Sequence, residues 1–249
     1  MKICFAFLTK GTINNELLWY EYFKNIKSNH EIEILIHCNQ NPNFKFLQNL
    51  TSQIFLNEVH TAWGKLQKVQ NFLMEKAKNL NCDKFIILSD SCIPIRDFNY
   101  LLNKLNNDKS IISNCESWDL SRFPDNNFKI KLMANQQWCI IDKKHFDLFL
   151  NDETRLYFED FVIFPEESYF STVIENNNKN NEDNIFSYIT TCVDWSRTNG
   201  SSPYYFDGNF QDIEYLNKCY ENENFLFFRK LKNCPDTDFI SIVKKNIGL

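Results

Sequence analysis

The chain has 249 residues, of which 43% are hydrophobic and 24% charged. This is the composition of a globular protein and excludes a disordered one. The formal net charge of −5 offers no basic face for a nucleic-acid partner. No stretch approaches the ~20 apolar residues of a membrane span, and the first apolar run is too short for a signal peptide. We therefore expect a soluble protein of the cytoplasm, with the secretory pathway as the alternative.

The nine cysteines are odd in number and scattered along the chain. No CxxC pair occurs, so the sequence indicates no zinc site. Free cysteine behaves as a small hydrophobic residue, which suits the six that lie in or beside apolar runs: Cys4, Cys38, Cys82, Cys92, Cys139 and Cys192. We expect mostly reduced thiols, and a disulfide framework is the alternative.

The first half of the chain alternates strand and helix patterns. Continuous apolar runs predict buried parallel strands, and helical spacing of apolar residues predicts helices between them. The predicted order is strand 3–8, helix 14–26, strand 32–37, a short strand from 54, helix 64–80, strand 85–88, helix 97–105 and strand 111–113. This order predicts an α/β fold, with a mostly parallel central sheet flanked by helices.

The second half is less regular. It predicts a strand at 137–141, helices at 143–150 and 166–175, a strand at 185–193 and a short apolar run at 225–228. The Asn-, Lys- and Glu-rich segment 176–184 predicts a solvated, poorly ordered loop. No repeat or linker is visible, so residues 1–249 are expected to form a single domain.

An acidic residue follows the strand that ends near Ser89. Asp90 lies where ligands gather in parallel sheets and could bind a ribose, a sugar hydroxyl or a metal. The alternative is a turn or helix-capping residue. Enzymes that hold a nucleotide sugar through a metal usually place Asp-x-Asp here, but the second position is Ser91. The literal Asp236-Thr237-Asp238 precedes the last helix, where N-capping explains it better.

Two adjacent acids, Glu166 and Glu167, follow Pro165. Either could be a general base, because a glutamate of pKa about 4.3 is ionised at neutral pH and desolvation raises its basicity. The alternative is that the helix dipole favours acids at a helix start. A glycoside hydrolase using both is disfavoured, since adjacent residues diverge by about 100° around a helix axis.

Two later segments carry cations beside aromatic residues. Trp195 could stack on a sugar ring, although a core tryptophan is commoner, and Arg197 could hold a phosphate. Arg229 and Lys230 follow an apolar run, where cations usually face solvent. An enzyme without a metal still needs a fixed Lys or Arg to neutralise a leaving diphosphate.

Taken together, these motifs resemble the core-2/I-branching N-acetylglucosaminyltransferase-like family, glycosyltransferase family 14, and particularly its plant-type branch. The resemblance covers nearly the whole chain. The matching segments, in the family's order, are residues 3–9, 59–64 (VHTAWG), 85–94 (FIILSDSCIP), 115–117, 137–138, 165–167, 193–197 (VDWSR) and 226–230.

The resemblance implies a GT-A-like fold and an inverting transfer from a UDP-sugar, with no divalent metal and no other cofactor. It implies Glu167 as the catalytic base and Lys230 as the support of the diphosphate. With these residues we assign donor binding to Ser89, Asp90, Arg197, Arg229 and Lys230, and acceptor binding to Glu116, Arg122, Trp138 and Trp195. Residues 1–114 would form the nucleotide-sugar-binding half, and 115–249 the acceptor and catalytic half.

The sequence therefore predicts a glycosyltransferase that moves N-acetylglucosamine, xylose or glucose from a UDP-sugar to a hydroxyl of a glycan or glycoprotein. The alternative is a catalytically inactive module on the same fold that binds a nucleotide sugar or a glycan. Release of UDP without an acceptor would separate these two functions.

Overall fold

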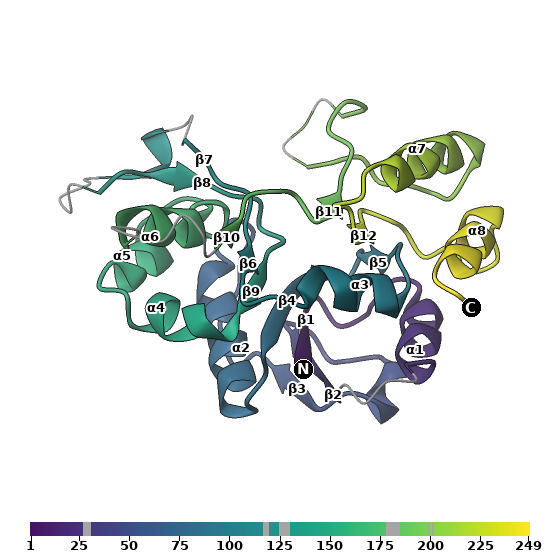
Figure 1. Cartoon of the computed structure of the whole chain (residues 1–249), viewed down its shortest axis with the longest axis horizontal. Helices are drawn as coiled ribbons and strands as arrows, with labels where there is room; N and C mark the ends of the chain where they lie inside the picture. Colours follow the sequence, from purple (N-terminus) through teal and green to yellow (C-terminus); the bar gives the residue numbers. More distant parts are fainter. Residues whose placement is uncertain (27–30, 117–119, 125–129, 178–184, 199, 201) are drawn as a thin grey trace.

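The structure is a computed structural model that describes residues 1–26, 31–116, 120–124, 130–177, 185–198, 200 and 202–249 (Figure 1). The strands are β1 (Lys2–Thr9), β2 (Glu31–Cys38), β3 (Gln53–Leu56), β4 (Lys84–Ser89), β5 (Ile93–Pro94), β6 (Ser110–Ile111), β7 (Cys115–Glu116), β8 (Met133–Ala134), β9 (Ile140–Asp142), β10 (Ile185–Phe186), β11 (Thr191–Cys192) and β12 (Phe227–Phe228). The α-helices are α1 (Glu16–Lys24), α2 (Gln67–Asn79), α3 (Phe98–Leu105), α4 (Phe146–Asn151), α5 (Arg155–Asp160), α6 (Tyr169–Asn177), α7 (Phe210–Glu221) and α8 (Asp238–Asn246).

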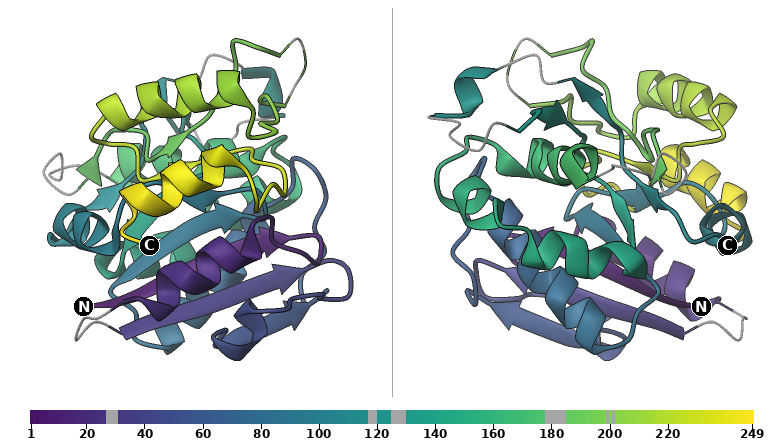
Figure 2. Two further views of the ribbon diagram at one scale, coloured as in Figure 1. Left: turned by 90° about the vertical axis from the view of Figure 1, so that its right-hand side faces the viewer. Right: turned by 60° about the vertical axis from the view of Figure 1, so that its left-hand side comes forward.

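A seven-stranded sheet in the order β10-β6-β9-β4-β1-β2-β3 forms the centre of the molecule. β1 pairs in parallel with β2 and β4, whereas β9 runs antiparallel to β4 and β6. Helices α1 and α3 lie on one side of this sheet and α2 and α4 on the other (Figures 1 and 2). Cover on both faces explains why the run 3–8 is apolar throughout. The predicted α/β fold, with a mostly parallel sheet flanked by helices, is confirmed.

Two predicted elements of the second half are wrong in their bounds. The helix expected from Glu166 begins only at Tyr169, and Pro165–Glu167 form a separate 3-10 turn. The strand expected over 185–193 is divided between β10 and β11, which belong to different sheets. The Ser187 hydroxyl accepts the Asn114 backbone N–H where β10 ends, so the chain leaves the large sheet there. Most of the loop expected at 176–184 lies outside the described residues.

One disulfide joins Cys192 of β11 to Cys219 of α7, with the two Cα atoms 6.4 Å apart. The expectation that Cys192 is a free apolar thiol is therefore wrong. Its partner lies in a helix that the apolar pattern did not predict, so the pairing was not visible in the sequence. The other seven cysteines are free thiols, as expected.

No helix in the described part of the chain combines the length and the apolar character needed to cross a bilayer.

Candidate active site

A cavity of about 580 Å³ opens at the carboxyl ends of β1, β2 and β4. This is where ligands bind in open α/β sheets. Thr9 and Asp90 line it at the ends of β1 and β4. Later segments complete the wall with Trp138, Glu167 and Lys230. The cavity thus combines residues from both predicted halves of the chain.

Asp90 lies beside three cations at the end of β4. Burial raises the pKa of its carboxyl, and Arg229, Lys230 and Lys10 act in the opposite direction. Asp90 caps no helix, because the N-cap of α3 is Asp97, whose side chain accepts the Tyr100 N–H. The preceding Ser89 is buried and bonds through its hydroxyl to that of Ser91. Ser89 and Asp90 both line the cavity.

Arg229 and Lys230 bring positive charge into the cavity. The Arg229 guanidinium lies 4.2 Å from the centre of the Trp138 ring, and burial lowers its pKa. Its Nε is buried without a hydrogen-bond partner among the described residues. Lys230 Nζ donates to Ser202 Oγ at 2.5 Å and to the Tyr205 hydroxyl at 3.2 Å. Within the described chain neither cation forms an ion pair, so both are available to an anion.

Glu167 lies in the turn between Phe164 and α6 and lines the same cavity. Its Oε2 is 2.8 Å from Arg122 Nη1, and its side chain is 39% exposed. The Arg122 guanidinium also lies 5.0 Å from the Phe164 ring centre. Arg122 therefore reaches the site through Glu167, without lining the cavity. Glu167 is also one of the negative charges that act on Arg229, so the acid and the cations share one electrostatic environment.

Glu166 is the buried member of the acid pair, with 3% exposure. Its Oε2 accepts the Leu66 backbone N–H at 3.1 Å, at the start of α2. Burial raises its pKa to about 7. The hydrogen bond from the Leu66 N–H lowers the pKa, and the negative charge of Glu167 raises it further. The residues alone do not indicate which of the two acids is the general base, because the burial of a turn residue depends on the chain that packs over it.

Aromatic residues form parts of the cavity wall. Trp138 is buried beneath Arg229, whereas Trp195 is 52% exposed. Trp63, which the sequence did not assign, also lines the cavity and is 71% exposed. Its position depends on Gly64, which has φ +71° and whose Cβ, if present, would lie 2.6 Å from the Phe164 ring. Only glycine fits here. The sequence pair Trp63-Gly64 is therefore the feature from which this cavity residue could have been predicted.

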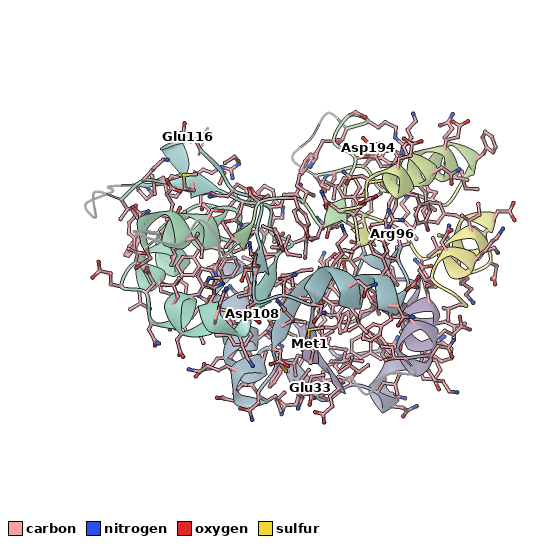
Figure 3. The ribbon with its side chains drawn as sticks, viewed as in Figure 1. Met1, Glu33, Arg96, Asp108, Glu116 and Asp194 are labelled. Carbon is pink, nitrogen blue, oxygen red and sulfur yellow. A yellow bond between two sulfur atoms is a disulfide. The ribbon has the colours of Figure 1, made fainter. Side chains whose placement is uncertain are left out.

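Two predicted site residues lie elsewhere. Arg197 pairs with Asp194 at 2.5 Å and Asp212 at 3.3 Å and stacks 4.0 Å from the Tyr204 ring centre. The structure thus gives it internal partners instead of a place in the cavity wall. Glu116 lies at the exposed end of β7, 3.7 Å from Lys131. Figure 3 shows Glu116 and Asp194 on separate upper lobes of the molecule.

Among the residues that the structure describes, no three His, Cys, Asp or Glu side chains are grouped to hold a metal ion. The Asp236-x-Asp238 motif lies at the start of α8, where the N-cap is the Thr237 side chain. The position of this motif is therefore explained by the start of a helix.

A cavity at the carboxyl ends of a mostly parallel sheet, lined by acids and by cations without ion-pair partners in the described chain, is typical of ligand-binding α/β proteins. The sequence model of the family "Branch: Core-2/I-Branching enzyme" matches residues 3–219. The chain belongs to this family, and the predicted family is confirmed.

Among the relatives, the chain is 22% identical over 166 residues to glycosyltransferase BC10 of Oryza sativa subsp. japonica. The match covers 61% of this chain and 41% of that protein, so the chain spans less than half of its relative.

Two solved structures are distantly similar. One is A197 from STIV, with 15% identity, a TM-score of 0.35 and coverage of 71% of this chain and 80% of that one. The other is a cytidylyltransferase from Leptospira borgpetersenii serovar Hardjo-bovis, with 13% identity, a TM-score of 0.39 and coverage of 98% and 94%.

Proposed function

We propose that this protein is an inverting, metal-independent glycosyltransferase, which moves a sugar from a UDP-sugar to a hydroxyl of a glycan or glycoprotein. Family membership and the relationship to a plant glycosyltransferase support the class of reaction. The observation that carries the mechanism is that Glu167 and Lys230 line one cavity. On unrelated surfaces the two side chains could not act on one substrate.

In this mechanism Glu167 takes the proton of the acceptor hydroxyl. The acceptor oxygen forms a bond to the anomeric carbon while the bond from that carbon to the diphosphate oxygen breaks. The electron pair of the broken bond leaves with UDP. Lys230 and Arg229 stabilise the negative charge that grows on the diphosphate, and Asp90 lies beside them to contact a hydroxyl of the donor.

The exposed tryptophans Trp63 and Trp195 support a carbohydrate acceptor. A tryptophan ring with a solvent-exposed edge is suited to a sugar ring, because the sugar has apolar C–H faces and polar hydroxyls. Arg122 holds the Glu167 carboxylate by an ion pair at 2.8 Å and so fixes the base relative to the acceptor.

The test uses UDP-N-acetylglucosamine, UDP-xylose and UDP-glucose with the full chain. We expect one donor to release UDP, and transfer to an acceptor to give a product of opposite anomeric configuration by NMR. Glu167→Gln should bind UDP as the wild type does, measured by calorimetry, and lose transfer. The matched control, Glu214→Gln on the exposed face of α7, should keep both.

Two results would overturn this function. Wild-type transfer by Glu167→Gln would remove the base from the mechanism. Binding of UDP without turnover of any donor would favour the inactive binding module.

A further inference from the structure

A second cavity, of about 510 Å³, is lined in part by the chain segment that joins β10 to β11. This segment passes between the two upper lobes in Figure 1. Tyr188 and Ile189 of this segment line the second cavity, whereas Val193, which follows β11, lines the first. Of the described residues, only Asn135 and Gln136 belong to both walls. The volume falls within the range of about 300–1,000 Å³ that small-molecule sites occupy.

The two cavities differ in charge. Lys10, Asp90, Glu167, Arg229 and Lys230 give the first its ionised groups. The described lining of the second contains no Asp, Glu, Lys, Arg or His. A diphosphate would find no opposite charge there to offset the loss of its hydration. The second cavity therefore favours an uncharged ligand.

The polar groups of the second cavity are amides and hydroxyls. Asn114, Asn222, Asn224 and Ser187 line it together with Gln136. Carboxamides donate and accept hydrogen bonds, as hydroxyls do, so they match a ligand that carries many hydroxyl groups. The buried side-chain oxygens of Asn114 and Gln136 have no partner within the described chain. Buried acceptors are rarely left unpaired. Asn114 lines the second cavity and not the first, so its oxygen is the one that a ligand hydroxyl there would satisfy.

The walls of the cavity are held by hydrogen bonds that a ligand would not replace. The Gln136 N–H donates to Ser113 Oγ at 2.7 Å, and the Asn224 N–H to Asn222 Oδ1 at 2.9 Å. Tyr188, packed 5.8 Å from the Phe186 ring centre, and Phe225 add apolar surface. Aromatic surface beside neutral polar groups is suited to the C–H faces of a sugar ring.

From this chemistry we infer that the second cavity is a binding site for a neutral saccharide, separate from the cavity that holds Glu167 and Lys230. The inference does not depend on sugar transfer in the first cavity. Asn135 links the two sites: it lines both, and its Nδ2 donates to the Glu166 carbonyl while its N–H donates to that of Glu167.

The experiment measures binding of cellotriose, xylotriose and chitotriose to the full chain by calorimetry, with UDP as the charged probe. We expect at least one trisaccharide to bind the wild type. Asn224→Leu and Tyr188→Ala should raise its Kd at least about tenfold, the loss of roughly 1.4 kcal/mol. Asn217→Leu, an exposed amide on α7, is the matched control and should bind as the wild type does. Lys230→Ala should also leave this Kd unchanged.

Amide chemical shifts of the ¹⁵N-labelled wild type provide a measurement that needs no variant. Saturating trisaccharide should shift signals in 113–115, 187–189 and 222–225. The inference is overturned if no trisaccharide binds, or if the shifts cluster at 63–64, 166–167 and 195, where the first cavity is proposed to hold its acceptor. It is equally overturned if Lys230→Ala removes binding while both second-cavity variants retain it. Failure of donor turnover, by contrast, would leave it standing.

Discussion

Two regions of the molecule place an arginine against aromatic rings and use it differently. Arg197 is enclosed by the carboxylates of Asp194 and Asp212. Arg229 lies over Trp138 with no carboxylate within ion-pair distance in the described chain, and its Nε is unpaired. An arginine already neutralised by the protein stabilises the fold, whereas one left open can bind an anionic ligand. The acids differ in burial instead: Glu166 is buried, whereas Glu167 is half-exposed and paired with Arg122.

The largest expected effect is the loss of the enclosed cation. Arg197→Leu leaves Asp194 and Asp212, whose side chains are 1% and 0% exposed, without their counter-charge. Breaking a buried pair in this way costs about 3–5 kcal/mol, which urea denaturation would measure. Arg197→Lys should recover part of the loss, since it keeps the charge and loses the stacking. An unchanged free energy of unfolding, or a weaker UDP affinity of the folded variant, would contradict the assignment.

The next largest effect concerns Lys230, one of the two cavity cations without an ion-pair partner in the described chain. Lys230→Met should lower transfer by about 10²–10³-fold, because one preorganised charge is removed from the leaving group. Stability should change by less than about 0.5 kcal/mol, since the Lys230 side chain donates only to the hydroxyls of Ser202 and Tyr205 in the described chain. Lys232→Met is the matched control: this exposed lysine pairs with Asp207. Equal activities of the two variants would show that Lys230 has no part in transfer.

The contrast between Arg197 and Lys230 also shows what could not be predicted from the sequence. Both cations follow short apolar segments, and nothing local separates their roles. Asp194 is three residues from Arg197, but Asp212 comes from α7, a helix that the sequence analysis does not predict. Arg229 and Lys230 were predicted together because the apolar run 225–228 placed them at a strand end. Their freedom from carboxylates is a property of tertiary packing.

The same physics explains which parts of the fold were predictable. β1 and β4 are buried on both faces, so their side chains form continuous apolar runs. Strands of two residues, such as β11 and β12, carry no periodic signal, and only their pairing defines them. The burial of Glu166 likewise depends on Leu66, which is 100 residues away along the chain.

The buried acid should make stability depend on pH. In the folded chain Glu166 titrates at about 7 instead of 4.5. Between these values the folded state retains a proton that the unfolded state has lost, so the free energy of unfolding falls as the pH rises from about 4.5 to 7. The fall is on the order of 3 kcal/mol. Glu166→Gln should abolish it and be the more stable protein at pH 8, because Gln still accepts the Leu66 N–H.

Urea denaturation at a series of pH values between 4 and 8 measures this slope. The exposed Glu214→Gln is the control and should keep the wild-type slope, since Glu166 is intact in it. A Glu166→Gln variant with the wild-type slope would mean that the buried carboxyl does not titrate in this range.

The smallest expected effect is that of a chelator. If Arg229 and Lys230 supply the positive charge, millimolar EDTA should leave transfer unchanged. A divalent ion would have to bind at Asp90, where three cations already act on a single carboxylate and repel a second positive charge. Mn²⁺ should therefore not restore activity to Lys230→Met. Loss of wild-type activity with EDTA, and its return with Mg²⁺ or Mn²⁺, would instead show that a metal ion stabilises the leaving group. Arg229 and Lys230 would then contribute only to binding of the donor before transfer.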